Sequence, residues 1–288
     1  MKDTIGIVAH DAGGAEVLSS WAKYCCQDRV IGYGEGPALK IFENVGIEQV
    51  NDINLLLELS KEIITATSWQ SNLEKKTIRM CHEKKIYVST MLDHWVNYQE
   101  RFMIENNLIL PNRILTLDKH ATQLARKDFG GVNIVEVKNV YLENRIKKVI
   151  NYQKKTTQQK YALFIGENIK EHALSSYGDE HHFGYTEETI LKNFWKRARK
   201  KLRQTSEIVI RPHPSQDTTQ YEWAKEIIPK KISISNSREL EQDIAESNLV
   251  FGINSMALVI SALSGKETYS CLPIENMLDL PFKEILRV

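Results

Sequence analysis

The stretch Ile5-Gly-Ile-Val-Ala-His-Asp-Ala-Gly-Gly-Ala-Glu16 decides the fold class of this chain. Residues 5–9 are apolar or small, as in a buried strand, and residues 15–24 carry apolar side chains at helical spacing. A strand that runs through a short turn into a helix is the first part of a β-α-β unit. Gly13 and Gly14 let a ligand approach the backbone closely, and the N–H groups at the helix start attract an anion.

Short apolar runs and amphipathic segments alternate along the rest of the chain, which predicts parallel sheets covered by helices. Further strands are expected at residues 29–33, 62–67, 85–90, 113–117, 132–137, 161–165, 207–211, 231–234, 248–253 and 267–271. Further helices are expected at residues 38–44, 70–82, 119–127, 141–152, 187–202, 221–227, 239–246 and 255–264. Residues 167–185 are expected to form a long functional loop.

The polar residues 153–160 interrupt this pattern and are the expected linker, because little in them can be buried. A length of 288 residues, at about 150 residues per domain, also favours two domains. The predicted fold is therefore α/β, with two Rossmann-like domains at residues 1–155 and 156–288 that face each other across a cleft.

The composition excludes several classes of protein. The chain has 38 Lys and Arg against 37 Asp and Glu, so no overall field recruits nucleic acid. Cys25, Cys26, Cys81 and Cys271 lack zinc-site spacing, and reduced thiols fit the cytosol. No signal peptide is visible, and the apolar runs are shorter than the roughly 20 residues that span a bilayer. We expect a cytoplasmic protein without metal or cofactor.

Ligands of open parallel sheets bind beyond the carboxyl ends of the strands, and the first such segment follows residues 5–9. It contains His10, Asp11, Gly13 and Gly14. Asp11 is a candidate general base, because a carboxylate at a strand end faces the ligand. The alternative is that Asp11 only caps the following helix.

A second polar segment, Leu92-Asp-His-Trp-Val-Asn-Tyr98, follows the strand expected at residues 85–90. Asp93 and His94 are candidates for proton transfer, and Tyr98 is a candidate for stacking on a sugar. The alternative is a polar loop whose groups bond to one another beneath the tryptophan.

Three further segments belong to the second half. In Arg211-Pro-His-Pro-Ser215 the two prolines stiffen the loop around His213, so that His213 and Arg211 can contact a phosphate. Asn254 and Ser255 precede an apolar helix whose first N–H groups suit a phosphate, although an ordinary helix cap explains the same residues. Gly166 and Glu167 end the first strand of this half.

These segments resemble motifs of GT-B glycosyltransferases, above all bacterial capsule and lipopolysaccharide enzymes of the sialyltransferase-like and glycerophosphotransferase-like kinds. His10-Asp11-Ala-Gly-Gly14 corresponds to an acidic, Gly-containing motif of the first domain, with Ala12 where that motif has a second acid. His213-Pro214 matches the His-Pro motif of the second domain, and Asn254-Ser255 stands where a Ser motif is expected.

The resemblance implies a metal-independent glycosyltransferase of polysaccharide biosynthesis that moves a sugar from a nucleotide donor to a saccharide acceptor. A CMP-linked acidic sugar is slightly favoured as donor, and peripheral association with the inner face of a membrane is compatible with this role. His213, Arg211 and the helix start at Asn254 and Ser255 would stabilise the leaving phosphate. Asp11 would deprotonate the acceptor, with Asp93 or His94 as substitutes.

Two alternatives remain open from the sequence. A nucleotide-sugar hydrolase or epimerase on the same fold would use Asp11 or His94 on water or on the sugar ring. A protein that binds a nucleotide-sugar without turning it over would need neither residue for chemistry.

Overall fold

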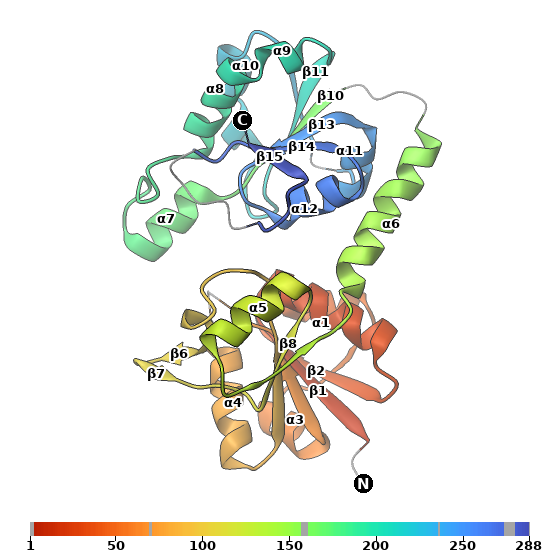
Figure 1. Ribbon diagram of the computed structural model, residues 1–288, viewed down its shortest axis with the longest axis vertical. Coiled ribbons are helices and arrows are strands. Elements are labelled where there is room, and N and C mark those ends of the chain that lie inside the picture. Colours follow the sequence, from red (N-terminus) through yellow and green to blue (C-terminus); the bar gives the residue numbers. More distant parts are fainter. Residues whose placement is uncertain (1–2, 69–70, 157–160, 236, 274–279, 288) are drawn as a thin grey trace. The chain divides into compact units, whose positions relative to one another are not determined.

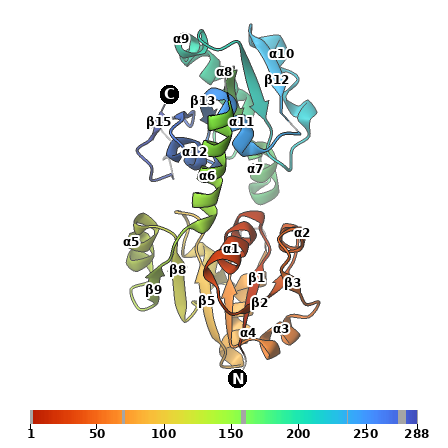
Figure 2. The ribbon, with the colours of Figure 1, turned by 90° about the vertical axis from the view of Figure 1, so that its right-hand side faces the viewer.

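The computed structural model describes residues 3–68, 71–156, 161–235, 237–273 and 280–287. The chain forms two compact units, Met1–Glu143 and Asn144–Val288, each built from helices packed on both faces of a parallel sheet (Figures 1 and 2). The expected α/β class with two Rossmann-like domains is confirmed. The predicted boundary at residues 155 and 156 lies later in the chain than this division, and residues 157–160 of the predicted linker lie outside the described residues.

The first unit contains a seven-stranded sheet in the order β3-β2-β1-β4-β5-β8-β9. Its strands are β1 (Thr4–Ala9), β2 (Arg29–Gly34), β3 (Glu48–Gln49), β4 (Glu62–Thr65), β5 (Tyr87–Met91), β8 (Arg113–Thr116) and β9 (Asn133–Glu136). Its helices are α1 (Ala12–Cys25), α2 (Pro37–Asn44), α3 (Ile53–Leu59), α4 (Leu73–Glu83), α5 (Lys119–Asp128) and the start of α6 (Val140–Lys155). A short 3-10 turn, η1 (Glu100–Phe102), leads into an antiparallel pair, β6 (Met103–Ile104) and β7 (Asn107–Leu108).

Alternation of side chains along β1 distributes the core over both faces of this sheet. Ile5 and Ile7 pack with residues of α1 and α2, whereas Val8 packs with residues of α3, α4 and α5 on the opposite face. Both faces are covered, so the strands are apolar on both sides. Polar side chains that could take part in chemistry therefore lie in the loops at the carboxyl ends of the strands.

Helix α1 begins at Ala12, three residues earlier than expected, so Gly13 and Gly14 lie in its first turn. A Cβ added to Gly14 would lie 2.5 Å from the Cβ of Ala66 in the loop after β4. Glycine at position 14 therefore permits α1 to approach the β4 loop closely. As a result, the polar loop after β1 and the polar loop after β4 lie close together at the edge of the sheet.

The second unit contains a six-stranded parallel sheet in the order β12-β11-β10-β13-β14-β15. Its strands are β10 (Tyr161–Ile165), β11 (Glu207–Arg211), β12 (Lys231–Ile234), β13 (Ser247–Gly252), β14 (Glu267–Ser270) and β15 (Ile285–Arg287). Its helical elements after α6 are α7 (Ile169–Tyr177), α8 (Glu187–Arg197), α9 (Arg199–Leu202), η2 (Thr218–Tyr221), α10 (Ala224–Ile227), α11 (Leu240–Glu246) and α12 (Met256–Leu263).

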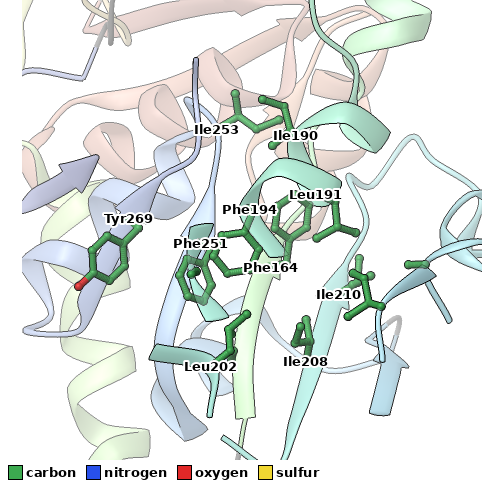
Figure 3. Close-up of a cluster of buried hydrophobic side chains, with 14 of the residues drawn as sticks. Phe164, Ile190, Leu191, Phe194, Leu202, Ile208, Ile210, Phe251, Ile253 and Tyr269 are labelled. Carbon is green, nitrogen blue, oxygen red and sulfur yellow. The ribbon is translucent and has the colours of Figure 1, made fainter. Parts of the chain in front are cut away.

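Figure 3 shows a hydrophobic core of this unit, in which Phe164 of β10 and Phe251 of β13 pack against Phe194 of α8. The rings of Phe194 and Phe251 have centroids 3.9 Å apart. Helices α11 and α12 pack on the sheet by contacts with β10, β13 and β14. The paired strands β10 and β13 thus lie at the middle of the sheet, where the order of strands changes direction.

Several sequence expectations are corrected by the structure. Residues 169–177 form α7 within the expected long loop, because Glu187 accepts hydrogen bonds from the N–H groups of Ile169 and Lys170 and so caps the helix from outside it. The helix expected at residues 187–202 is two helices, interrupted at Ala198. The elements β3, α3, β6, β7 and β15 were not expected, and Gln70 of the expected helix 70–82 lies outside the described residues.

A Gly14→Val substitution tests the contact between α1 and the β4 loop. We expect it to lower the free energy of unfolding by about 1–3 kcal/mol, because the new side chain overpacks Ala66. Urea unfolding followed by circular dichroism measures the change. Gly131→Val is the control, since no atom lies within 4 Å of a Cβ added there. Equal stability of the two variants would contradict the close approach.

Candidate functional site

His10 and Asp11 form a contacting pair directly after β1. The Nδ1 atom of His10 lies 2.7 Å from Oδ1 of Asp11, and both side chains are partly exposed. Asp11 occupies the N-cap position of α1, but its side chain makes no capping hydrogen bond. When Nδ1 donates to Asp11, Nε2 of the neutral imidazole is left as a proton acceptor. The pair is therefore able to take up a proton at this edge of the sheet.

Asp93, in the loop after β5, is held by a buried arginine. Thr67 Oγ1 donates to Asp93 Oδ1 at 3.0 Å, and Arg101 Nη1 lies 2.6 Å from Thr67 Oγ1 and 3.4 Å from Asp93 Oδ1. The Arg101 side chain is only 5% exposed. A Cβ added to Gly13 would lie 3.2 Å from Asp93 Oδ2, so Asp93 faces the first turn of α1. The structure therefore places Asp93, from the loop after β5, beside the start of α1, which follows His10 and Asp11.

Glu74, in the first turn of α4, was missed by the sequence analysis. Its Oε1 accepts a hydrogen bond of 2.8 Å from the backbone N–H of His10. The residue is 2% exposed, and burial raises the pKa of its carboxyl to about 7. No local sequence signal identifies it, because its partner lies 64 residues away.

The other two residues predicted for the β5 loop, His94 and Tyr98, have aromatic or apolar neighbours. The His94 ring lies 5.5 Å from the ring of Trp95, whose Nε1 donates to Asp118 Oδ2 at 2.7 Å. Tyr98 is 2% exposed and packs in the hydrophobic core, where burial raises its pKa above the usual value. Tyr98 is therefore buried, with Asp118, Arg101 and Asp93 as its charged neighbours.

In the second unit, Glu167 joins the loops after β10 and β13. Its Oε1 accepts hydrogen bonds from the N–H groups of Ile253, at 3.2 Å, and Asn254, at 2.7 Å. Burial raises the pKa of Glu167 to about 7. Two of the N–H groups that precede α12 are thus already bound to a carboxylate. Ser255 is the N-cap residue of α12 without a capping bond, and its Oγ has no hydrogen-bond partner among the described residues.

His213 is fixed by its own loop and by the neighbouring one. Its Nδ1 lies 2.8 Å from Ser215 Oγ, and its backbone N–H donates to Gln216 Oε1 at 2.9 Å. Asn168 Nδ2 donates to Ser215 Oγ at 2.9 Å, which connects the β10 loop to the β11 loop. Partial burial of the ring lowers the pKa of His213, and Glu171 acts in the opposite direction. Adjacent residues 167 and 168 therefore link the loops that carry His213 and Asn254.

Arg211 and Gly166 have structural partners within the unit. Arg211 Nη1 donates to Asp243 Oδ2 at 2.7 Å and to the carbonyl oxygen of Arg238 at 2.8 Å. Asp243 is fully buried, so Arg211 balances its charge. A side chain at Gly166 would collide with the hydroxyl of Tyr221. Phosphate binding by Arg211 stays a prediction, as do the roles of Pro214 and the other site residues.

A pocket of about 340 Å³ lies beside the His213 loop. It is lined by polar residues and two aromatic ones: Asn168, Lys170, Glu171, Glu187, Glu188, Gln216, Gln220, Tyr221 and Trp223. Gln216 and Asn168 connect it to His213 through the bonds just described. Three carboxylates against one lysine in the lining disfavour an anionic occupant and suit hydroxyl groups or a nucleobase.

Over the described ranges, no three His, Cys, Asp or Glu side chains are arranged to hold a metal ion. Over the same ranges, no helix combines the length and the apolar character needed to span a bilayer.

The fold is of the GT-B type, shared by glycosyltransferases and nucleotide-sugar epimerases with two Rossmann-like domains. The chain is similar to the UDP-GlcNAc 2-epimerase of Neisseria meningitidis bound to UDP-GlcNAc (9% identity, TM-score 0.59, 93% of this chain and 82% of that chain). It is also similar to HepE of Anabaena in complex with UDP (12%, 0.58, 93% and 80%) and to the glycosyltransferase SnogD of Streptomyces nogalater (7%, 0.50, 94% and 81%). At such identities the likeness concerns the fold alone. No protein-family model and no curated protein matches the sequence.

An Arg101→Met substitution tests the support of Asp93. We expect the free energy of unfolding to fall by about 3–5 kcal/mol, because a partly buried carboxylate loses its buried cation. Arg126→Met, at an exposed position on α5, should change it by about 0.5 kcal/mol or less. Denaturant unfolding at pH 7 compares the two, and equal effects would contradict the proposed support.

The raised pKa of Glu167 predicts that the stability of the second unit depends on pH. Its folded pKa of about 7 lies above the ordinary value of 4.5, so its contribution to stability is complete below pH 4.5 and is lost as the pH rises through 7. A Glu167→Gln variant should therefore gain thermal stability relative to the wild type between pH 5 and about pH 8. Melting temperatures across this range measure the difference, and a constant difference would contradict the raised pKa.

Proposed function

We propose that this chain is a metal-independent glycosyltransferase that uses a nucleotide-sugar donor. The observation that carries the proposal is the joining of three loops at the carboxyl edge of the second sheet. Glu167 bonds to the loop after β13, and Asn168 bonds to the His213 loop after β11. The polar pocket opens beside them. The fold likeness to proteins solved with UDP or UDP-GlcNAc supports a nucleotide-sugar ligand.

The donor is assigned to the second unit. His213 and the start of α12 at Ser255 would bind the phosphates, because an imidazole and unpaired helix N–H groups both favour negative charge. These donors would stabilise the charge that develops as the phosphate leaves. The hydroxyl-bearing part of the donor would take the pocket, since its glutamates repel anions. The His213-Pro214 resemblance favours a CMP-linked acidic sugar, whereas two solved proteins of similar fold, the Neisseria meningitidis epimerase and HepE, are bound to UDP-GlcNAc and UDP.

The acceptor and the proton transfer are assigned to the first unit. Asp11 and the His10 imidazole in contact with it would accept the proton of the acceptor hydroxyl. Asp93 is the substitute, since it faces the first turn of α1 from the β5 loop. Roles in capsule or lipopolysaccharide synthesis rest on the motif resemblance.

A nucleotide-sugar epimerase or hydrolase is the second candidate. The observation in its favour is the carboxylate and imidazole cluster of Asp11, His10, Asp93 and Glu74, which could move a proton on a sugar ring or activate water. The fold likeness to a UDP-GlcNAc 2-epimerase is equally compatible with this chemistry. Conversion of the donor in the absence of any acceptor distinguishes it from the transferase.

The deciding experiment screens CMP, UDP and other nucleotides by thermal shift, because a ligand of the folded state raises the melting temperature. Sugars linked to the nucleotide that binds are then incubated with and without saccharide acceptors. Transfer that requires an acceptor supports the proposal, and conversion without one supports the epimerase or hydrolase. Binding without any conversion supports a non-catalytic protein.

A His213→Ala substitution is expected to lower kcat about 100-fold to 1000-fold, the effect of removing one group that stabilises developing charge. The melting temperature should change little, because His213 lies in an exposed loop outside the hydrophobic core. His181→Ala is the control, since His181 is exposed in the same unit and pairs only with Glu180 in the described interactions. Wild-type turnover by the His213→Ala variant would remove His213 from the mechanism.

A further inference from the structure

Glu74 is a buried carboxyl group whose position packing alone does not explain. Its Oε1 accepts the N–H of His10, while its Oε2 is buried and has no hydrogen-bond partner among the described residues. A buried polar oxygen without a partner costs free energy, so the bond to the His10 N–H accounts for one oxygen of Glu74 and not for the other. The second oxygen therefore points to a role of the carboxyl beyond stability.

The hydrogen bond of Glu74 to His10 ties α4 to the residue that begins the candidate site. His10 is held at two points, its main chain by Glu74 and its Nδ1 by Asp11. Gly36 leaves space for the ring, because a Cβ at that position would lie only 2.8 Å from Nε2. Loss of the Glu74 bond would release the main chain of the loop.

We propose that Glu74 is a positioning residue for the His10–Asp11 pair and that its ionised form holds the pair in the productive geometry. The inference rests on the proposed function only in assigning proton transfer to this pair. A carboxylate is a stronger acceptor than a neutral carboxyl, so the bond to the His10 N–H tightens when Glu74 loses its proton.

The charges around Glu74 set the pH at which its carboxyl loses the proton. Asp11 and His10 face it from the loop after β1, and Lys75 lies next to it on α4. Burial is the main cause that raises the pKa of Glu74 to about 7, and Asp11 adds to it. Activity should therefore rise with pH around neutrality.

The test compares Glu74→Gln, Glu74→Ala and the control Glu83→Gln, at an exposed position on the same helix. The first readout needs no substrate: the backbone ¹⁵N–¹H resonance of residue 10, followed from pH 5 to about pH 9 in chains that also carry His10→Asn, so that no imidazole at this position adds a step of its own. With Glu74 present, and also with Glu83→Gln, the resonance should shift with a midpoint at about pH 7. With Glu74→Gln that step should disappear, and its persistence would overturn the proposal.

The second readout is the pH profile of kcat with the donor and acceptor identified above. The wild type should rise through pH 7, Glu74→Gln should be flat, and Glu74→Ala should lose about 10-fold to 100-fold in kcat with donor KM unchanged. Glu74→Gln keeps the acceptor oxygen and serves as the test if Glu74→Ala does not fold. A wild-type profile in Glu74→Gln would overturn the positioning role. Absence of any turnover would refute the proposed function, while the resonance of His10 would still decide whether Glu74 holds the loop.

Discussion

Backbone N–H groups that emerge from the ends of central parallel strands need acceptors, and in both units a buried glutamate supplies them. Glu74 accepts the N–H of His10 after β1, and Glu167 accepts those of Ile253 and Asn254 after β13. An unpaired main-chain group at these positions would be costly, because the strands beside it end at the same edge. The two carboxyls fix the loop after β1, which carries His10 and Asp11, and the loop after β13, which carries Asn254 and Ser255. Burial raises the pKa of both to about 7, so the same groups that fix the loops also make them sensitive to protonation.

The course of the central strands could be predicted from the sequence because they are short apolar runs. The strand expected at residues 161–165 is β10 without any change, and that expected at residues 5–9 differs from β1 by one residue. The edge strands β3 and β15 could not be predicted, because they have two and three residues and are defined only by their pairing. Helix α7 was missed because only Ile169 and Ala173 are buried on it, too few for a helical pattern.

The residues of the candidate site also fall into those that could be predicted from the sequence and those that could not. His10, Asp11, Asp93 and His213 could be proposed from sequence because polar residues directly after a strand must lie at its carboxyl end. Glu74, and Arg101 with Thr67, depend on approaches between residues far apart in the chain, which no local pattern reveals. Arg211 shows the limit of the rule: the residue ends β11 as expected, but its guanidinium is bound to Asp243 of α11. The position of a residue along a strand predicts whether it lies at the carboxyl edge of the sheet. The direction in which its side chain points is determined by packing.

Each sheet draws its strands from one continuous part of the chain, residues 4–136 for the first and 161–287 for the second. No strand of the later unit is needed to complete the earlier sheet. The ribosome therefore releases every strand of the first sheet before it makes any of the second. The amino-terminal unit can bury its apolar surface during translation, which limits the time during which that surface is open to aggregation.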